Sequence, residues 1–300
     1  MQAQQWKGVT GGGTLGQKLL ILLFRFVPVK AMYWVLWLVT PFYMLFNRKA
    51  YKATYSYFRT QWGYAPLRAL NKTYRNHIIF GQCMFDRFAV FAGKAKSFNV
   101  QFTGYEHRER FMQDKRGCVV ATAHVGNFEI GGYLLGEVIQ KKTITMTFGG
   151  ESSVISSNRE QRLNTNEMTT LSNSADMAHI FVLRNALLEG QMVTMMCDRM
   201  VGNEKRVECS FLNGKADFPQ GAFALAVNTN VPMIAVFVMK ETKSVYHSYS
   251  IPLEIEQSET MNRQEKIAAY AKQYVAALES VLRKYPEQWF NYYDFWKTQS

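Results

Sequence analysis

Residues 117–129 read GCVVATAHVGNFE, and this run indicates the class of fold. Its first part, Gly117 to Ala123, is almost continuously apolar, which is typical of a strand that is buried on both faces of a sheet. Asn127 is a favourable N-cap for a helix over the apolar positions that follow it. His124 therefore lies in a turn from strand to helix, at the open end of a sheet where α/β proteins usually carry their sites.

Similar patterns recur along the chain after residue 97. Apolar or β-rich runs alternate with helical stretches, and this order predicts an α/β domain over residues 97–300, with a mixed central sheet flanked by helices. The predicted strands are 98–102, 118–123, 143–148, 192–197, 207–211, 233–239 and 245–251, and the predicted helices are 127–140, 178–189, 219–228 and 263–284. Residues 149–173, rich in Ser and Asn, predict a loop or mobile helix near a site, or a plain surface excursion.

The excess positive charge lies in the first part of the chain. The formal net charge is +12, and residues 1–118 contain 18 Lys or Arg but only four Asp or Glu, whereas the rest contains 17 basic and 19 acidic residues. An excess of this kind is the electrostatic footprint expected for an anionic partner, either nucleic acid or anionic lipid.

The apolar residues beside these charges favour a lipid surface over nucleic acid. Ala31 to Phe46 has sixteen residues without a charge, including Trp34 and Trp37. At about 1.5 Å per residue this run reaches roughly 24 Å, short of the ~30 Å hydrocarbon core, and Pro41 is expected to kink it. We therefore expect residues 1–96 to form a basic, aromatic helical region that lies in or dips into the cytoplasmic leaflet, with a spanning helix or buried soluble helices as alternatives.

His124 and Glu129 are the candidate catalytic pair. On one continuous helix, residues five apart are separated by about 140°, but the turn at Gly126 allows the carboxylate to approach the imidazole. Neutral imidazole suits the removal of a proton from an attacking alcohol or amine, and a carboxylate on its other ring nitrogen fixes the tautomer. We therefore expect Glu129 to orient His124 and His124 to act as the base. His-x4-Glu alone is a weak pattern, and a capping or buried hydrogen-bonding His is the competing interpretation.

The run from His124 to Glu129 resembles the first block of the lysophospholipid acyltransferase-like superfamily, and more narrowly that of its bacterial lipid A biosynthesis (lauroyl/myristoyl) acyltransferases. Two later blocks agree in order and spacing, residues 190–226 and residues 285–290, which read YPEQWF. The resemblance covers most of the chain. It implies acyl transfer from an acyl carrier protein or acyl-CoA thioester to a hydroxyl or amine of a membrane lipid acceptor, with no cofactor and no metal.

The resemblance also implies roles for single residues. His124 and Glu129 fall on the catalytic dyad of that family, and Asp198 falls on an Asp of its pattern. Gly214 marks the loop before the second helix. The chain departs from the family pattern at residues 198–202, which read DRMVG, and at 211–214, which read FLNG. These departures lie where acceptor recognition is expected, so they concern the identity of the acceptor rather than the reaction.

Polar and charged residues around this loop and around the turn form the candidate substrate site. The basic members are predicted to clamp a phosphate group of the donor or acceptor. Solvated loop charges are the alternative for these basic residues, and a turn cap is the alternative for the acidic one. The predicted substrate-binding residues are Asn127, Asp198, Arg199, Lys205, Arg206, Gly214 and Lys215.

Other classes of site are not indicated. The four cysteines show no C-x-x-C spacing and no clustering with His, so neither a zinc site nor a disulfide framework is predicted. No G-x-S-x-G motif supplies a serine nucleophile. The remaining alternatives are a lipid esterase or thioesterase that uses the same His on water, and a non-catalytic peripheral membrane-binding protein. The expected partners are anionic membrane lipids, acyl carrier protein and the lipid acceptor, not nucleic acid, at the inner (cytoplasmic) membrane with the active site facing the cytoplasm.

Overall fold

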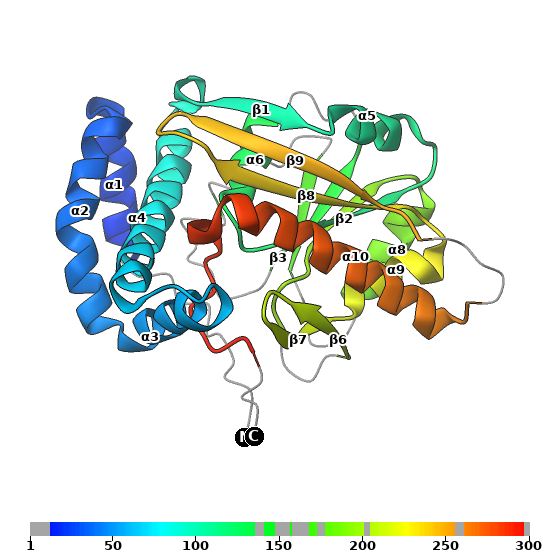
Figure 1. Ribbon diagram of the computed structural model, residues 1–300. Coiled ribbons are helices and arrows are strands. Elements are labelled where there is room, and N and C mark those ends of the chain that lie inside the picture. Colours follow the sequence, from blue (N-terminus) through cyan, green and yellow to red (C-terminus); the bar gives the residue numbers. More distant parts are fainter. Residues whose placement is uncertain are drawn as a thin grey trace.

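A seven-stranded mixed sheet forms the centre of the molecule, with helices packed around it (Figure 1). The computed structural model describes residues 13–135, 141–147, 157, 168–172, 178–200, 205–255 and 261–296. The sheet has the order β1-β9-β8-β2-β5-β3-β4. Its strands are β1 (Asn99–Thr103), β2 (Cys118–Thr122), β3 (Thr143–Thr147), β4 (Met168–Ser172), β5 (Met192–Met196), β8 (Met233–Lys240) and β9 (Val245–Leu253).

Strand β2 lies in the interior of this sheet and is buried along its whole length. It pairs parallel with both β5 and β8, while β8 pairs antiparallel with β9. Because helices cover the faces of a parallel sheet, a central strand has no polar side, and this accounts for the continuous apolar run of 118–122. The prediction of an α/β fold with a mixed central sheet is confirmed.

The four helices predicted after the first strand are present, although residues 136–140 of the first one lie outside the described residues, and one short helix, α5 (Tyr105–Gln113), is additional. The predicted four are α6 (Phe128–Leu135), α8 (Ala178–Leu188), α9 (Gly221–Thr229) and α10 (Arg263–Lys284). Helix α10 begins at a capping box between Asn262 and Glu265, in which each side chain accepts from the backbone of the other. Its long apolar face covers the sheet (Figure 1).

Two strands are absent from the sequence-based prediction. Strand β4 lies inside segment 149–173, predicted as a loop or excursion, and pairs parallel with β3. As the last strand at one edge of the sheet it needs no continuous apolar run, which explains the missed signal. Apart from residue 157, the rest of that segment lies outside the described residues. Strand β7 (Gly214–Pro219) pairs antiparallel with β6 (Arg206–Phe211) in a separate two-stranded hairpin.

Among the described residues, four α-helices precede the first strand, and α1, α2 and α4 lie side by side at one end of the sheet (Figure 1). They are α1 (Gly13–Phe26), α2 (Val29–Phe46), α3 (Arg48–Ser56) and α4 (Pro66–Phe91), with a π-helical turn at Tyr57–Gln61 after α3. Within the described residues, α2 is the one helix that is long and apolar enough to cross a membrane, and 28% of it is buried inside the protein. Helix α2 continues through Pro41.

Large apolar side chains on α1 and α2 face solvent. They include both tryptophans of α2, and they outnumber the exposed large apolar side chains described in the sheet domain, most of which lie on α8. An exposed apolar surface of this extent usually marks an interaction site for a membrane or a protein. The exposed members are Leu15, Leu19, Leu22, Leu23, Phe26, Trp34, Val35, Trp37, Leu38, Val39, Phe42, Tyr43, Leu45 and Phe46.

Candidate active site

The parallel pairing of β2 with β5 places His124 next to Asp198. The register aligns Thr122 with Met196, and the backbone N–H of Cys197 donates to the carbonyl of Thr122 at 2.9 Å, which extends the pairing past the strand ends. His124 and Asp198 each follow the last aligned residue of their strand by two positions. They therefore meet at the carboxyl ends of two neighbouring parallel strands, the usual location of α/β sites.

Two hydrogen bonds join these residues. Nδ1 of His124 lies 2.8 Å from Oδ1 of Asp198, and the backbone N–H of His124 donates to Oδ2 at 3.0 Å. The Asp198 side chain is fully buried, whereas 20% of the His124 side chain is exposed. An ionised carboxylate only accepts, so this contact assigns the proton of neutral His124 to Nδ1. The unprotonated Nε2 is then available to a substrate, and no described residue hydrogen-bonds to it.

The C-terminal segment completes the surroundings of Asp198. Trp289 donates from Nε1 to Oδ2 of Asp198 at 3.1 Å and forms an isolated antiparallel bridge with Val125. The backbone N–H of Phe290 donates to the carbonyl of His124, and that of Gly126 donates to the carbonyl of Gln288, both at 2.9 Å. The segment that resembles the terminal block of the family therefore packs directly along the His124 turn.

Burial and neighbouring charges set the protonation states of the pair. Burial and the positive charge of Arg199 lower the pKa of His124, although Asp198 opposes this shift. Burial disfavours ionisation of Asp198, but the charge and hydrogen bonds of His124, together with the charge of Arg199, lower the pKa of Asp198 to about 2. Near neutral pH the arrangement is a neutral imidazole against a carboxylate, as a general base requires.

The position of Glu129 differs from the expectation. Its carboxylate was expected on the ring of His124, but the carboxylate on Nδ1 is that of Asp198. Both carboxylate oxygens of Glu129 instead accept from Nη1 of Arg87 on α4, at 3.1 Å each. Glu129 lies in the first turn of α6, and the Arg87 side chain is almost fully buried beside it. The pairing of parallel strands, which has no local sequence signature, decides which carboxylate reaches His124.

Gly126 and Asn127 hold the turn that carries His124. Gly126 has a φ of +53°, and a Cβ at this position would lie 2.0 Å from the carbonyl oxygen of Val238, so no other residue fits. Asn127 caps α6 by accepting from the backbone N–H of Ile130 at 3.3 Å, as predicted. Its amide Nδ2 has two protein acceptors, the carbonyl of Cys83 and the hydroxyl of Tyr246, so this side chain positions the turn.

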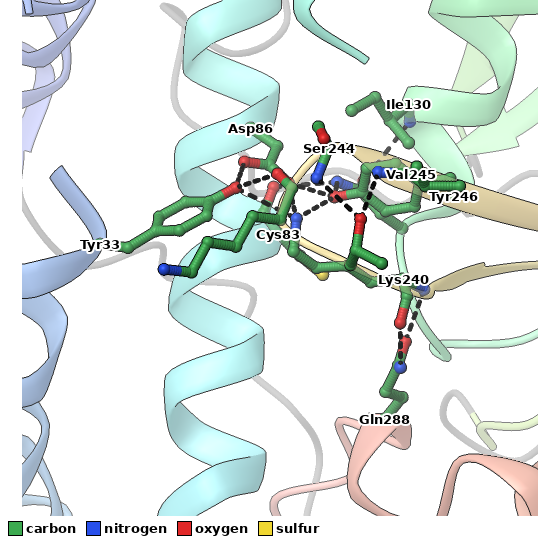
Figure 2. A network of polar contacts seen from close by, with 12 residues as sticks. Tyr33, Cys83, Asp86, Ile130, Lys240, Ser244, Val245, Tyr246 and Gln288 are labelled. Carbon is green, nitrogen blue, oxygen red and sulfur yellow. Dashed lines mark hydrogen bonds and ion pairs between the residues drawn. The ribbon is translucent and has the colours of Figure 1, made fainter. Parts of the chain in front are cut away.

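A buried polar network connects the N-terminal helices to this turn, as Figure 2 shows. Asp86 on α4 is fully buried and accepts from the hydroxyls of Tyr33 on α2 and Tyr246 on β9, and from Nζ of Lys240 on β8. Because Tyr246 also accepts from Asn127, a continuous chain of contacts runs from α2 to the start of α6.

The other side of the turn is tied to Lys240 through Gln288. Oε1 of Gln288 accepts from the backbone N–H of Lys240 at 2.8 Å, and Nε2 of Gln288 donates to the carbonyl of Lys240 at 2.7 Å (Figure 2). The carbonyl of Gln288 in turn accepts from Gly126. The turn is therefore fixed from two sides by buried contacts, which is what a preorganised site needs.

The predicted basic substrate residues separate into two groups. Nη2 of Arg199 donates to the carbonyl of Phe290 at 2.6 Å, so Arg199 belongs to the His124 cluster. On the β6–β7 hairpin, Arg206 pairs with Asp217 at 3.2 Å and Lys215 pairs with Glu208 at 3.4 Å. Both cations are exposed and both pairs lie within the hairpin, so the structure does not bring these two cations into the hydrogen-bonded cluster.

The remaining two substrate candidates also lie at this hairpin. Lys205 is exposed just before β6, and its carbonyl accepts from the backbone N–H of Gln220 at 2.9 Å. Gly214 lies under the indole of Trp296, where an added Cβ would approach the ring to 2.7 Å. Close packing therefore accounts for this glycine, and a phosphate clamp on the hairpin stays a prediction.

Sequence reasoning missed two residues of the cluster. Trp289 lies in the block 285–290 but is absent from the predicted site residues, yet its indole hydrogen-bonds Asp198. Arg87 lies in α4 without a recognisable motif, and only the adjacent charges Asp86 and Arg87 within an apolar stretch of the helix could have drawn attention to it.

Comparison with known proteins identifies the family of the chain. Residues 69–298 match the family model described as "Bacterial lipid A biosynthesis acyltransferase", which is more than half of the 300-residue chain. The matched range begins within α4 and includes Arg87, the His124 turn, Asp198 and Trp289. A search of curated proteins found no match to the chain.

Proposed function

We propose, from the premise that the chain belongs to the bacterial lipid A biosynthesis acyltransferase family, that His124 is the general base of its acyl transfer. The family makes the protein an acyltransferase that acts on a lipid acceptor. The observation that carries the proposal is the His124–Asp198 pair, because it leaves Nε2 of a neutral imidazole available beside the end of the sheet.

In the proposed reaction, Nε2 of His124 removes the proton from a hydroxyl or amine of the acceptor while that group attacks the carbonyl carbon of a thioester. The new ester or amide bond forms as the carbon–sulfur bond breaks. The thiolate leaving group then takes the proton from the imidazolium. Asp198 holds the ring in the productive tautomer and stabilises the imidazolium through its contact with Nδ1, so it acts as a positioning residue.

Glu129 has a different proposed role from the ring contact expected of it. Its ion pair with the buried Arg87 joins the first turn of α6 to α4. Because α6 begins directly after the His124 turn, this pair supports the position of the base. On this proposal both His124 and Glu129 are required for activity, but only His124 transfers the proton.

An acyl carrier protein or acyl-CoA thioester is the proposed donor, and the basic first part of the chain supports this choice. Acyl carrier protein is acidic, and both it and an anionic lipid surface are attracted by the 18 basic residues within 1–118. A lipid A precursor is the acceptor class that the family favours. The protein acts, on this proposal, at the cytoplasmic face of the inner membrane.

The exposed apolar faces of α1 and α2 support a location at the cytoplasmic face of the inner membrane. Family membership and the apolar helix α2 are consistent with membrane association. The side chains of Trp34 and Trp37 are more than half exposed, and tryptophan is enriched at the boundary between headgroups and acyl chains. We therefore place α1 and α2 in or on the cytoplasmic leaflet, with the sheet domain beside it.

The test is acyl transfer by purified protein from labelled acyl carrier protein to an inner-membrane lipid extract. His124→Ala is expected to lower the rate by about 10²- to 10⁴-fold, the usual contribution of a general base. His107→Ala on the exposed helix α5 is the matched control and should leave the rate unchanged. Full transfer by His124→Ala contradicts the mechanism. Release of free acid without labelled lipid product would instead support a thioesterase.

A further inference from the structure

An apolar groove of about 720 Å³ lies between the C-terminal part of α2, the start of α3 and the N-terminal part of α4. Its apolar walls include Leu45, Leu67 and Leu70, whose exposed fractions are 66%, 82% and 42%. None of the lining residues belongs to the His124 cluster. A volume of this size is ordinary for a binding site of a small molecule or a single acyl chain.

A hydrogen bond beside the groove joins α2 to α4. Pro41 has no N–H, so the carbonyl of Trp37 lacks the hydrogen bond that residue 41 would give it inside α2. The hydroxyl of Tyr74 on α4 donates to that carbonyl instead, at 2.8 Å, and the Trp37 and Tyr74 rings meet edge to face. The hydrogen bond that Pro41 removes from α2 is thus replaced by one from Tyr74 on α4. Both Pro41 and Tyr74 line the groove.

The charges at the groove are all positive. Arg48 and Lys52 line it, and no lining residue is acidic. Both side chains are exposed, and within the described part of the chain no carboxylate pairs with either of them. The first turn of α3, which begins at Arg48, also lacks acidic residues. An apolar channel that opens beside two uncompensated cations is complementary to an amphiphile with an anionic headgroup.

We infer that this groove binds one anionic phospholipid of the membrane, with an acyl chain along Leu45, Leu67 and Leu70 and the phosphate on Arg48 and Lys52. Leu45 belongs both to the groove and to the exposed apolar face of α2, so a lipid enters from the leaflet along that face. The site is separate from the base at His124. It fixes the depth and orientation of the protein on the membrane and does not require acyl transfer.

The test is photo-crosslinking in vesicles of phosphatidylcholine that contain a trace of phosphatidylglycerol with a diazirine in its acyl chain. The full-length His124→Ala variant is used, so that no turnover consumes the probe and failure of the catalytic proposal leaves this one intact. Peptides from residues 41–52 and 67–74 should carry most of the adducts. The same diazirine chain on phosphatidylcholine should label these peptides several-fold less.

Three sets of variants distinguish lipid binding in the groove from general adsorption of the protein to the vesicle. Arg48→Gln with Lys52→Gln should lower groove adducts by about ten-fold or more, since each basic side chain near an anionic surface contributes roughly five-fold in affinity. Lys266→Gln with Lys272→Gln on α10 removes the same charge elsewhere and should not. Leu70→Trp fills the groove and should abolish its adducts, while cosedimentation with the same vesicles is retained.

Three results would overturn the inference. The first is equal labelling by the two headgroups, and the second is an equal loss in the α10 control. The third is displacement of the probe from the groove by an acyl thioester but not by unlabelled phosphatidylglycerol, which would make the groove a donor site.

Discussion

The His124 cluster and the N-terminal helices use opposite physical means to place their functional groups. At the end of β2, both carboxylate oxygens of Asp198 are buried and hydrogen-bonded, and strand register and these hydrogen bonds fix their position. On α1 and α2, large apolar side chains remain exposed and are available to a membrane or protein partner. Chemistry requires preorganisation within a fraction of an ångström, whereas adsorption to a fluid leaflet requires only area and charge.

Among the predicted changes, Asp198→Asn should have the largest effect, and this effect is on the rate of acyl transfer at the His124 cluster. Asparagine keeps the shape but presents no full negative charge to Nδ1, so the tautomer and the imidazolium lose their support. The transfer rate is expected to fall by about 10³-fold or more, as measured with labelled acyl carrier protein. Asp114→Asn, which disturbs an exposed pair with Arg116, is the control and should be neutral. If Glu129→Gln costs far more than Asp198→Asn, the positioning carboxylate is Glu129 after all.

Asp86→Asn tests whether the two regions are joined by the buried network. It leaves Lys240, with a side chain only 4% exposed, without its countercharge, and should lower the free energy of unfolding by about 3–5 kcal/mol. Denaturant unfolding measures this change. Asp86→Leu combined with Lys240→Met removes both charges and should recover part of the loss. Unchanged stability of the single variant would mean that the network does not contribute to the fold.

Leu38→Glu should separate adsorption from catalysis. Leu38 on α2 is 70% exposed, so its replacement leaves the fold intact but removes apolar area from the membrane contact. Vesicle affinity is expected to fall by about 2 kcal/mol, the usual worth of burying one such side chain, while transfer to a detergent-dispersed acceptor stays unchanged. Leu188→Glu on α8 is an equivalent exposed change outside the N-terminal helices and should leave vesicle binding unaltered.

The smallest expected effect is a shift in the pH dependence. The base must be neutral, and the pKa of His124 is lowered by burial and by Arg199, so activity should be full at neutral pH and fall on acidification, with a midpoint below the ordinary value of about 6.5. Arg199→Gln removes the positive charge, which raises this pKa and moves the midpoint upward. Rates normalised to the alkaline plateau measure the shift. A midpoint that moves downward would contradict the assignment.

Local patterns were sufficient for most of the elements and for His124. A buried apolar run followed by Asn127 predicted β2, the turn and α6, because strand burial and helix capping depend on residues adjacent in sequence. The apolar and aromatic run of α2 likewise predicted a surface for lipid. Edge strand β4 escaped prediction because an edge strand needs no apolar run.

The sequence by itself determined the fold class, the family resemblance and His124 as the candidate base. Only the tertiary structure decided which carboxylate meets that base. His124 and Asp198 are 74 positions apart and meet through the register of two parallel strands, which is set by packing of the whole sheet rather than by any short motif. The same holds for Arg87 beside Glu129 and for Tyr74 beneath Pro41, since each contact depends on how separate helices pack.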